Sequence, residues 1–195
     1  MTLSKGDPFH RFAEWMKEAE KNEPEDPNAM SVTSAALDGR PSTRMVLLKA
    51  YDERGFVFYT NYESRKGRQI LANPNVALLF HWKSLRRQIN IEGHAKPVSN
   101  EEADAYFATR PVASRIGAWA SQQSRPLTGR FELEKRIAEF TLKFGLGETP
   151  RPPHWSGFCV APERMEFWSD KPFRLHERLV YLKDGDGWRT ESLYP

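Results

Sequence analysis

The chain has 195 residues, of which 39% are hydrophobic and 12% aromatic, which suits one globular core better than two full domains. Its 29 Lys and Arg residues outnumber 26 Asp and Glu only slightly and are scattered, which argues against a nucleic-acid-binding protein. No apolar run reaches the ~18 residues that a membrane span needs, and residues 1–7 show no signal-peptide core.

The first part of the chain predicts a helix followed by a linker. Asp7 before Pro8 is typical of a helix start, and apolar residues then recur at helical spacing from Phe9 to Met16. One face of this helix should therefore pack on a core, and the prolines of segment 22–28 indicate a linker. We expect one domain over residues 1–195, in which 1–28 form the helix and linker and 29–195 form a barrel with inserted helices.

From residue 29 on, the sequence predicts short strands joined by tight turns, such as Asp38-Gly39. The expected strands cover residues 31–37, 43–51, 56–60, 76–82, 87–96, 157–160, 164–168, 175–182 and 188–193. The expected helices cover 64–72, 99–110, 112–120 and 131–144, the first capped by Ser64 and the second by a Ser99–Glu102 capping box. Many short antiparallel strands with a few helices favour a mainly β (α+β) small barrel over a doubly wound sheet.

Several familiar cofactor and metal motifs are absent from the sequence. It has no GxGxxG fingerprint, no GxxxxGK[ST] loop, no GxSxG elbow and no paired-His motif. The single cysteine, Cys159, allows no internal disulfide and no cysteine metal cluster, so we expect a cytoplasmic protein without a metal site. Any cofactor must be held by side chains and isolated backbone groups.

The basic segment 64–68 has an unfavourable charge for a helix start. If Ser64 is the cap, then Arg65, Lys66 and Arg68 lie in the first turn, where the helix dipole is positive. Each cation there costs about 0.3–1 kcal/mol. A bound phosphate would reverse this sign, because free N–H groups and cations converge on it. An exposed basic helix that tolerates the cost agrees equally well with these residues.

Arg44 and Lys49 are the cationic ends of an otherwise apolar stretch. A separation of five puts them on opposite faces of a regular strand, because side chains alternate with period two. They should then serve different ligand groups, unless a bulge realigns them. Two strand-end charges that reach out to water explain the pattern equally well.

Arg174, His176 and Arg178 are spaced by two. An extended backbone would aim all three at one face, with Leu175 and Leu179 pointing oppositely into a core. Three potential cations on one face repel one another, so an anionic or electron-rich ligand is the simplest compensation. Carboxylates are the alternative partners, with candidates at Glu166, Asp170 and Glu177.

Taken together, these segments resemble the pyridoxamine 5′-phosphate oxidase family. Among them are RMVLLK at 44–49, SRIGAW at 114–119 and RLHER at 174–178. The remaining matching segments are 58–61, 64–66, 87–88, 123–124 and 166–168. No single segment is specific, but the matches follow the family's order from residue 29 to the C-terminus.

The resemblance implies an FMN-binding split β-barrel that forms a homodimer with two FMN molecules at the subunit interface. The implied FMN contacts are Arg44, Met45, Val46, Leu47, Leu48, Lys49, Tyr59, Thr60, Arg65, Lys66, Gln88, Gln123, Ser124, Trp168 and Arg178. The implied substrate contacts are Lys49, Tyr106, Arg110, Ser114, Arg174 and His176, of which Arg174 and His176 are the implied catalytic residues against the pyridine ring. Arg44 would then face the flavin phosphate and Lys49 the substrate phosphate.

The implied activity is oxidation of pyridoxamine or pyridoxine 5′-phosphate to pyridoxal 5′-phosphate in vitamin B6 salvage. FMN would take a hydride equivalent from the 4′ carbon, and dioxygen would reoxidise it to give hydrogen peroxide. Arg174 would orient the ring and stabilise charge, since a guanidinium is not a base, while His176 would position the ring or transfer a proton.

Two alternatives stay open beside this activity. One is another flavoenzyme on the same barrel, such as a phenazine-pathway-type oxidase, and the other is a non-catalytic flavin- or pyridoxal-phosphate-binding protein. Neither a nucleic acid nor a membrane is expected as a partner. Family members carry a longer N-terminal segment that can cover the site, and only six residues precede Asp7, so we expect this lid to be missing or partial.

Overall fold

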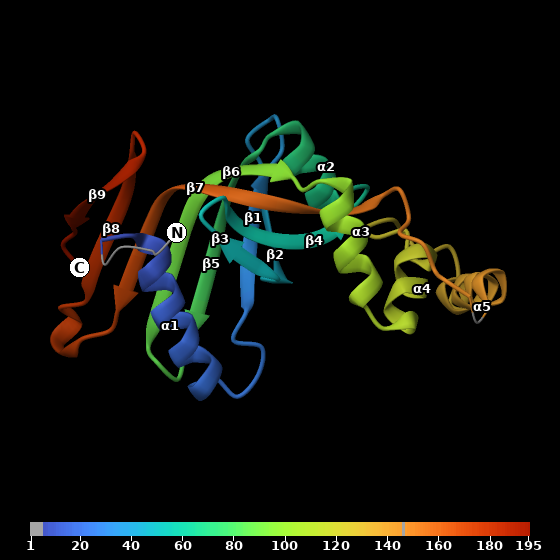
Figure 1. Cartoon of the computed structure of the whole chain (residues 1–195), viewed down its shortest axis with the longest axis horizontal. Helices are drawn as coiled ribbons and strands as arrows, with labels where there is room; N and C mark the ends of the chain where they lie inside the picture. The colour runs from blue at the N-terminus through green and yellow to red at the C-terminus, as the bar shows by residue number, and fades with distance from the viewer. Residues whose placement is uncertain (1–5, 146) are drawn as a thin grey trace.

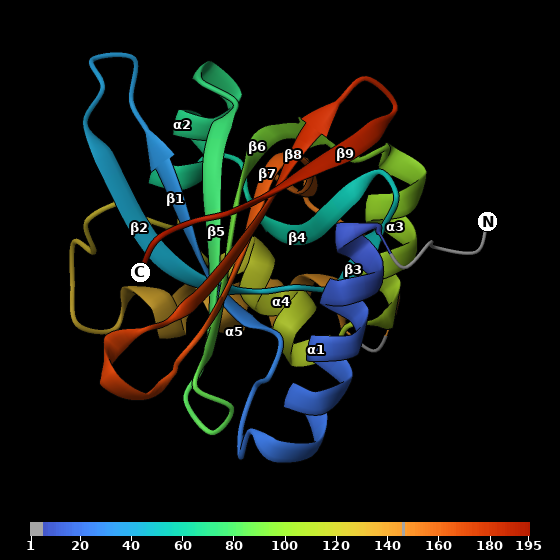
Figure 2. The same cartoon turned by 90° about the vertical axis from the view of Figure 1, so that its left-hand side faces the viewer.

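The protein is described by a computed structural model that covers residues 6–145 and 147–195. Residues 1–5, on which most of the signal-peptide prediction falls, lie outside the described residues. Within the described ranges, nine strands form one antiparallel sheet in the order β2-β1-β5-β6-β7-β4-β3, with β8 beside β7 and β9 beside β8. β2 and β3 are consecutive in the chain yet end opposite sides of this order, because the sheet curls on itself (Figures 1 and 2). The curled half-barrel with flanking helices confirms the predicted fold class.

The elements have the following bounds. The helices are α1 (Pro8–Asn22), α2 (Arg65–Ala72), α3 (Asn100–Thr109), α4 (Val112–Ala120) and α5 (Glu132–Phe144), with one 3-10 turn at Pro172–Arg174. The strands are β1 (Ala29–Ala35), β2 (Pro41–Leu47), β3 (Ala50–Asp52), β4 (Gly55–Asn61), β5 (Asn75–Trp82), β6 (Arg87–Pro97), β7 (Trp155–Ser169), β8 (Glu177–Asp184) and β9 (Gly187–Ser192).

Helix α1 begins as the sequence predicts and packs on the curled sheet. The Asp7 carboxylate accepts the Phe9 N–H at 2.8 Å, and Pro8 occupies the first turn. Phe12 is fully buried, and its ring lies 4.9 Å from that of Phe56 on β4. Each fully buried side chain of this size contributes about 1.5–3 kcal/mol, so the aromatic face of α1 accounts for the docking of the helix.

Two of the predicted strand boundaries in the barrel are wrong. The strand expected over 43–51 is broken, because β2 pairs with β1 and β3 pairs with β4. In the break, Lys49 donates its backbone N–H to Val57 O at 2.8 Å. No single strand joins Arg44 to Lys49, so the predicted opposite-face relation between them does not apply. The strands expected over 157–160 and 164–168 are one continuous strand, β7. It pairs with the whole of β6, and the register of this pairing shifts once, between Glu92 and Gly93.

Helices α3, α4 and α5 gather at one end of the molecule, opposite β8 and β9 (Figure 1). The helix expected over 131–144 is present as α5, but none of its residues is buried. Its aromatic residues pack on α4, where the Trp119 ring lies 5.6 Å from Phe140 and 5.4 Å from Phe144. This end of the molecule therefore has its own small aromatic cluster, apart from the main core.

Within residues 6–145 and 147–195, no helix is long and apolar enough to cross a membrane. In the same part of the chain, no group of three His, Cys, Asp or Glu side chains is placed to hold a metal ion.

Candidate active site

A cleft of about 720 Å³ opens where β2, β4, α3 and α4 meet. It brings together many of the predicted site residues, namely Met45, Val46, Leu47, Lys49, Tyr59, Thr60, Lys66, Tyr106, Arg110, Ser114 and Gln123. Lining residues that were not predicted are Asn61, Thr109, Pro111, Gly117, Ala118, Ser121 and Trp155. Residues of β2, β4, α2, α3, α4 and β7, and of the segments between them, thus meet at one hollow that is large enough for a cofactor-sized molecule.

The basic start of α2 forms one end of this cleft. Ser64 caps the helix, as predicted, with its Oγ accepting the Gly67 N–H at 3.2 Å. The first turn contains no acidic residue, so the cations there have no local compensation. Arg65 is exposed, whereas Lys66 turns inward.

Lys66 is a buried cation whose hydrogen-bond partners are neutral. Only 9% of the residue is exposed, and Nζ donates to Thr60 Oγ1 at 3.0 Å and to Gln123 Oε1 at 3.1 Å. Burial, together with the nearby charge of Arg44, lowers the pKa of Lys66 to about 8. A buried ammonium without a counter-charge is costly, and an anion bound in the cleft would remove that cost.

Gly67 allows α2 to approach the end of β4 closely. A Cβ at this position would lie 2.5 Å from Asn61 O and 2.5 Å from Tyr62 Cα, which are backbone atoms. Any larger residue would therefore push the basic helix start away from the cleft.

We expect Gly67→Ala to lower the free energy of unfolding by about 1–3 kcal/mol, the usual cost of overpacking, in urea denaturation without added ligand. Gly117→Ala in α4 is the matched control, because a Cβ there meets open space. Alanine should stabilise that helix position by about 0.5–1 kcal/mol. A neutral or stabilising Gly67→Ala would mean that α2 can shift without strain.

Arg110, at the C-cap of α3, brings a second uncompensated charge to the cleft. Its guanidinium lies 4.7 Å from the centre of the Trp155 ring, and the buried Nη1 has no hydrogen-bond partner among the described residues. Burial lowers the pKa of Arg110 from its ordinary value. The Trp155 ring is nearly parallel to Tyr59 at 5.3 Å, and Tyr59 stacks on Tyr106 at 4.0 Å. These rings hold the guanidinium in place without neutralising it.

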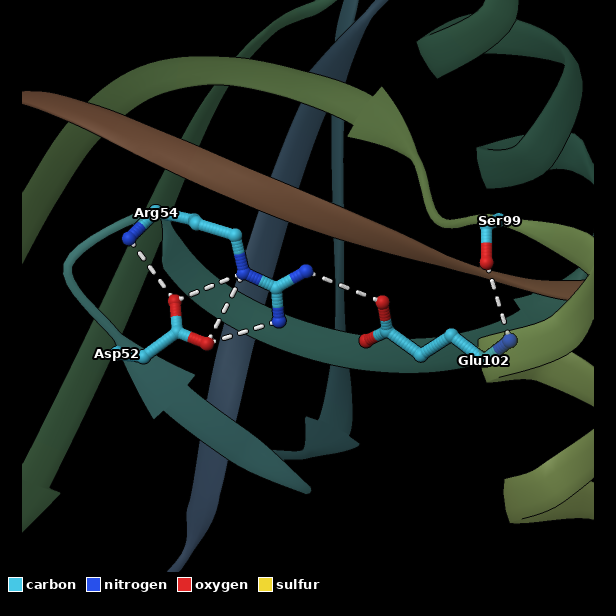
Figure 3. Close-up of polar contacts among 4 residues, drawn as sticks. All are labelled: Asp52, Arg54, Ser99 and Glu102. Carbon is cyan, nitrogen blue, oxygen red and sulfur yellow. Dashed lines mark hydrogen bonds and ion pairs between the residues drawn. The ribbon is translucent and has the colours of Figure 1, made fainter.

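A chain of charges fixes the first turn of α3 to the β3–β4 turn (Figure 3). Arg54 donates to both Asp52 oxygens at 2.8–3.1 Å and to Glu102 Oε2 at 3.2 Å. Glu102 in turn donates its backbone N–H to the Ser99 cap at 3.1 Å. Exposed ion pairs of this kind contribute less than about 1 kcal/mol each, so their effect is mainly to orient the helix that carries Tyr106.

Arg151 fixes the same helix to the start of β7. Its guanidinium donates to Asp104 Oδ1 at 2.6 Å and to Asn100 Oδ1 at 3.0 Å, both on α3. It also donates to the backbone oxygen of Trp155 at 2.8 Å. Arg151 therefore holds both α3, which ends at Arg110, and the backbone of Trp155, whose ring packs against Arg110.

A second, smaller hollow of about 390 Å³ lies on the sheet surface and holds another group of predicted cofactor contacts, Gln88, Trp168 and Arg178. Arg178 Nε donates to Glu166 Oε1 at 2.7 Å. Burial alone would raise the pKa of Glu166, but hydrogen bonds from Arg178 and Arg164 lower it below its ordinary value. Within this single chain, the group does not line the cleft that contains Lys66 and Arg110.

The predicted one-face arrangement of Arg174, His176 and Arg178 is wrong. β8 begins only at Glu177, and Arg174 lies in a 3-10 turn with a φ of 62°, so the segment is not extended. Leu175 is 66% exposed rather than buried, because it too precedes the strand.

Glu166 and Asp170 are confirmed as carboxylate partners of this segment, whereas the prediction for Glu177 is wrong. His176 Nδ1 lies 3.0 Å from Asp170 Oδ1, and the His176 ring packs 4.7 Å from Trp168. Arg178 pairs with Glu166, and Glu177 pairs with Lys171 at 3.1 Å. Arg174 itself is exposed to solvent.

The remaining predicted contacts lie beside the cleft rather than on its wall. Arg44 is half-buried next to Arg65 and Lys66, and burial followed by the charge of Arg65 lowers its pKa. The Leu48 side chain belongs to the core, with 4% exposed. Ser124, with a φ of 68°, lies in the loop after Gln123 and lines a neighbouring hollow of about 230 Å³.

Comparison with known proteins identifies relatives for nearly the whole chain. Residues 16–144 match the family model described as pyridoxamine 5′-phosphate oxidase, and residues 155–195 match the model of the pyridoxine 5′-phosphate oxidase C-terminal dimerisation region. A pyridoxine/pyridoxamine 5′-phosphate oxidase from Caulobacter vibrioides is 61% identical over 99% of this chain and 87% of its own length.

Two solved structures are similar in fold. PhzG from Burkholderia lata 383, in complex with tetrahydrophenazine-1-carboxylic acid, has a TM-score of 0.92 and 35% identity over 97% of this chain and 93% of its own. A pyridoxamine 5′-phosphate oxidase-related, FMN-binding protein from Nostoc punctiforme has a TM-score of 0.77 and 15% identity, with both chains covered completely, which supports the fold alone.

Proposed function

The chain belongs to the pyridoxamine 5′-phosphate oxidase family, and from this membership we propose that it oxidises pyridoxamine and pyridoxine 5′-phosphate to pyridoxal 5′-phosphate, with FMN as cofactor and dioxygen as acceptor. The chain is thus an oxidoreductase that produces pyridoxal phosphate. A cytoplasmic location is part of the proposal, since one cysteine in 195 residues suits a reducing compartment.

The observation that carries this proposal is the pair of uncompensated cations in the cleft. Lys66 has neutral hydrogen-bond partners, and Arg110 Nη1 has none among the described residues. Both the proposed cofactor and the proposed substrate carry a phosphate, and each phosphate would supply the charge that one cation lacks. The residues present therefore fit two phosphate-bearing molecules.

We assign the two ends of the cleft accordingly. Lys66 with Arg44 and Arg65 would hold the FMN phosphate at the start of α2, where backbone N–H groups and the helix dipole also favour an anion. Arg110 would hold the substrate phosphate, with Lys49, Tyr106 and Ser114 beside it. Bound FMN supplies the two-electron chemistry, while anchoring of the phosphate by these residues orients the reacting carbon.

A homodimer is part of the same proposal. The C-terminal match is to a dimerisation region, and Gln88, Trp168 and Arg178 lie in a hollow separate from the cleft. A partner subunit that brings its copy of this hollow, with Arg174 and His176, to the cleft would complete the set of contacts. Each site would then use residues of both subunits.

The direct test is the reaction itself. Purified protein loaded with FMN should convert pyridoxamine 5′-phosphate in air to pyridoxal 5′-phosphate, with consumption of one dioxygen per product. Protein that binds FMN but forms no aldehyde would support a non-catalytic flavin-binding protein instead. Oxidation of a reduced phenazine carboxylate in preference to pyridoxamine 5′-phosphate would support the phenazine-pathway alternative, which the similarity to PhzG makes worth assaying.

The affinity for FMN should fall as pH rises above about 8. In the free protein Lys66 loses its proton near this pH, since burial and the charge of Arg44 lower its pKa to about 8. A bound phosphate, which is already doubly ionised above about pH 6, would keep Lys66 protonated, so binding at higher pH must take up a proton. Titrations followed by flavin fluorescence from pH 7 to 9.5 should show this fall in FMN affinity for the wild type and no such fall for Lys66→Met. A wild-type affinity that does not change with pH would contradict the assignment.

A further inference from the structure

Arg44 is held by a hydrogen-bond network that gives it orientation but no counter-charge. Its Nη1 donates to Val32 O at 3.0 Å and to Ser34 Oγ at 2.9 Å, and its Nη2 donates to Ser42 Oγ. No carboxylate bonds to Arg44 within the described part of the chain, and its charged neighbours, Arg65 and Lys66, are also cations. The full positive charge of Arg44 therefore remains available.

Both hydroxyls of this network are fixed by one amide oxygen on α2. Gln69 Oε1 accepts from Ser34 Oγ at 2.7 Å and from Ser42 Oγ at 2.6 Å. Each serine hydroxyl thus donates its hydrogen bond to Gln69 Oε1 and accepts one from the guanidinium of Arg44. Gln69 is 9% exposed and Ser34 is 1% exposed, so both residues are largely shielded from water.

The position of Gln69 links this network to the basic helix start. Gln69 follows Arg65 by four residues on α2, and α2 lies beside β1, the strand that carries Ser34 (Figure 2). A glutamate at this place would accept the same two hydrogen bonds but would neutralise Arg44. The neutral amide orients the guanidinium and leaves its charge for a ligand.

We propose that Gln69 is a positioning residue that, through Ser34 and Ser42, aims the uncompensated Arg44 guanidinium at the phosphate of the flavin. The inference rests on the proposed function, in which Arg44 faces the FMN phosphate. Gln69 itself does not touch the ligand, so its effect passes through Arg44 and concerns the phosphate rather than the flavin ring.

The test compares FMN with riboflavin, which has the same ring system without the phosphate. Full-length wild-type protein, Gln69→Leu and Gln69→Glu are freed of flavin and titrated with each compound by flavin fluorescence. Both variants should bind FMN about tenfold more weakly, the size expected when one charge-assisted hydrogen bond is misdirected or neutralised, while riboflavin affinity stays unchanged. Leu71→Ala, at an exposed position on the same helix, is the control and should bind both compounds as the wild type does.

Three outcomes would overturn the inference while leaving the proposed phosphate site in place. Gln69→Glu with wild-type FMN affinity would mean that only hydrogen-bond geometry matters, and equal losses of FMN and riboflavin affinity would mean a general structural role. Losses that add when Gln69→Leu is combined with Arg44→Met would mean that Gln69 does not act through Arg44. Wild-type protein that binds FMN no better than riboflavin would instead refute the assignment of the phosphate site, and the inference with it.

Discussion

Replacing Lys66 by methionine should weaken FMN binding about a hundredfold without destabilising the flavin-free protein. Methionine fills much of the same volume but removes a charged donor, and a hydrogen bond to a charged group contributes about 1.5–3 kcal/mol. In the free protein the same cation is buried, and its hydrogen-bond partners among the described residues are the neutral Thr60 and Gln123, so its removal also relieves a desolvation cost. A lysine that binds the cofactor should therefore lower FMN affinity when it is replaced, without lowering the stability of the flavin-free protein. A structural lysine should do the reverse.

The measurement pairs the Kd for FMN with the melting temperature of the flavin-free protein. Lys17→Met is the matched control, because Lys17 is an exposed lysine on α1, away from the cleft. The control should leave FMN affinity unchanged. A Lys66→Met protein that melts well below the wild type while retaining its FMN affinity would show that Lys66 stabilises the fold and does not bind the cofactor.

The local elements of the fold could be predicted from the sequence because their signals are local. Asp7, Ser64 and Ser99 cap helices where they were expected to, each through a side-chain oxygen that accepts a backbone N–H two or three residues on. The break at Lys49 could not be predicted, because it arises where the chain passes from one end of the curled sheet to the other. That crossing depends on tertiary structure, whereas the local pattern of residues 43–51 predicts a single strand.

The candidate site was predicted unevenly for a similar reason. The cations at the start of α2 conflict with the helix dipole, and this local conflict was visible in the sequence. Gln69 and Trp155 carry no such signal, since a buried glutamine and an indole under a guanidinium are recognised only from their neighbours. The spacing of Arg174, His176 and Arg178 gave a false geometry, because Arg174 adopts a positive φ that alternation along a strand does not anticipate.

Arg110→Met and Arg174→Met should each lower kcat/KM for pyridoxamine 5′-phosphate by about a hundredfold or more, with FMN content unchanged. Each removes a guanidinium proposed to contact the substrate, and loss of a charged contact in a desolvated site costs about 3 kcal/mol. Arg110 lies at the cleft, whereas Arg174 lies in the exposed turn before β8. Arg130→Met, which removes an exposed charge outside the cleft, is the control for both.

Mixing the two variants tests whether one site draws on both subunits. If Arg174 reaches the cleft of the partner, a dimer with one subunit of each variant contains one site with both arginines intact and one with neither. Random pairing after unfolding and refolding together should then restore about a quarter of wild-type activity, since half of the dimers are mixed and each has one intact site of two. If both arginines served the same subunit's site, every site in the mixture would lack one arginine and activity would stay at the level of the single variants.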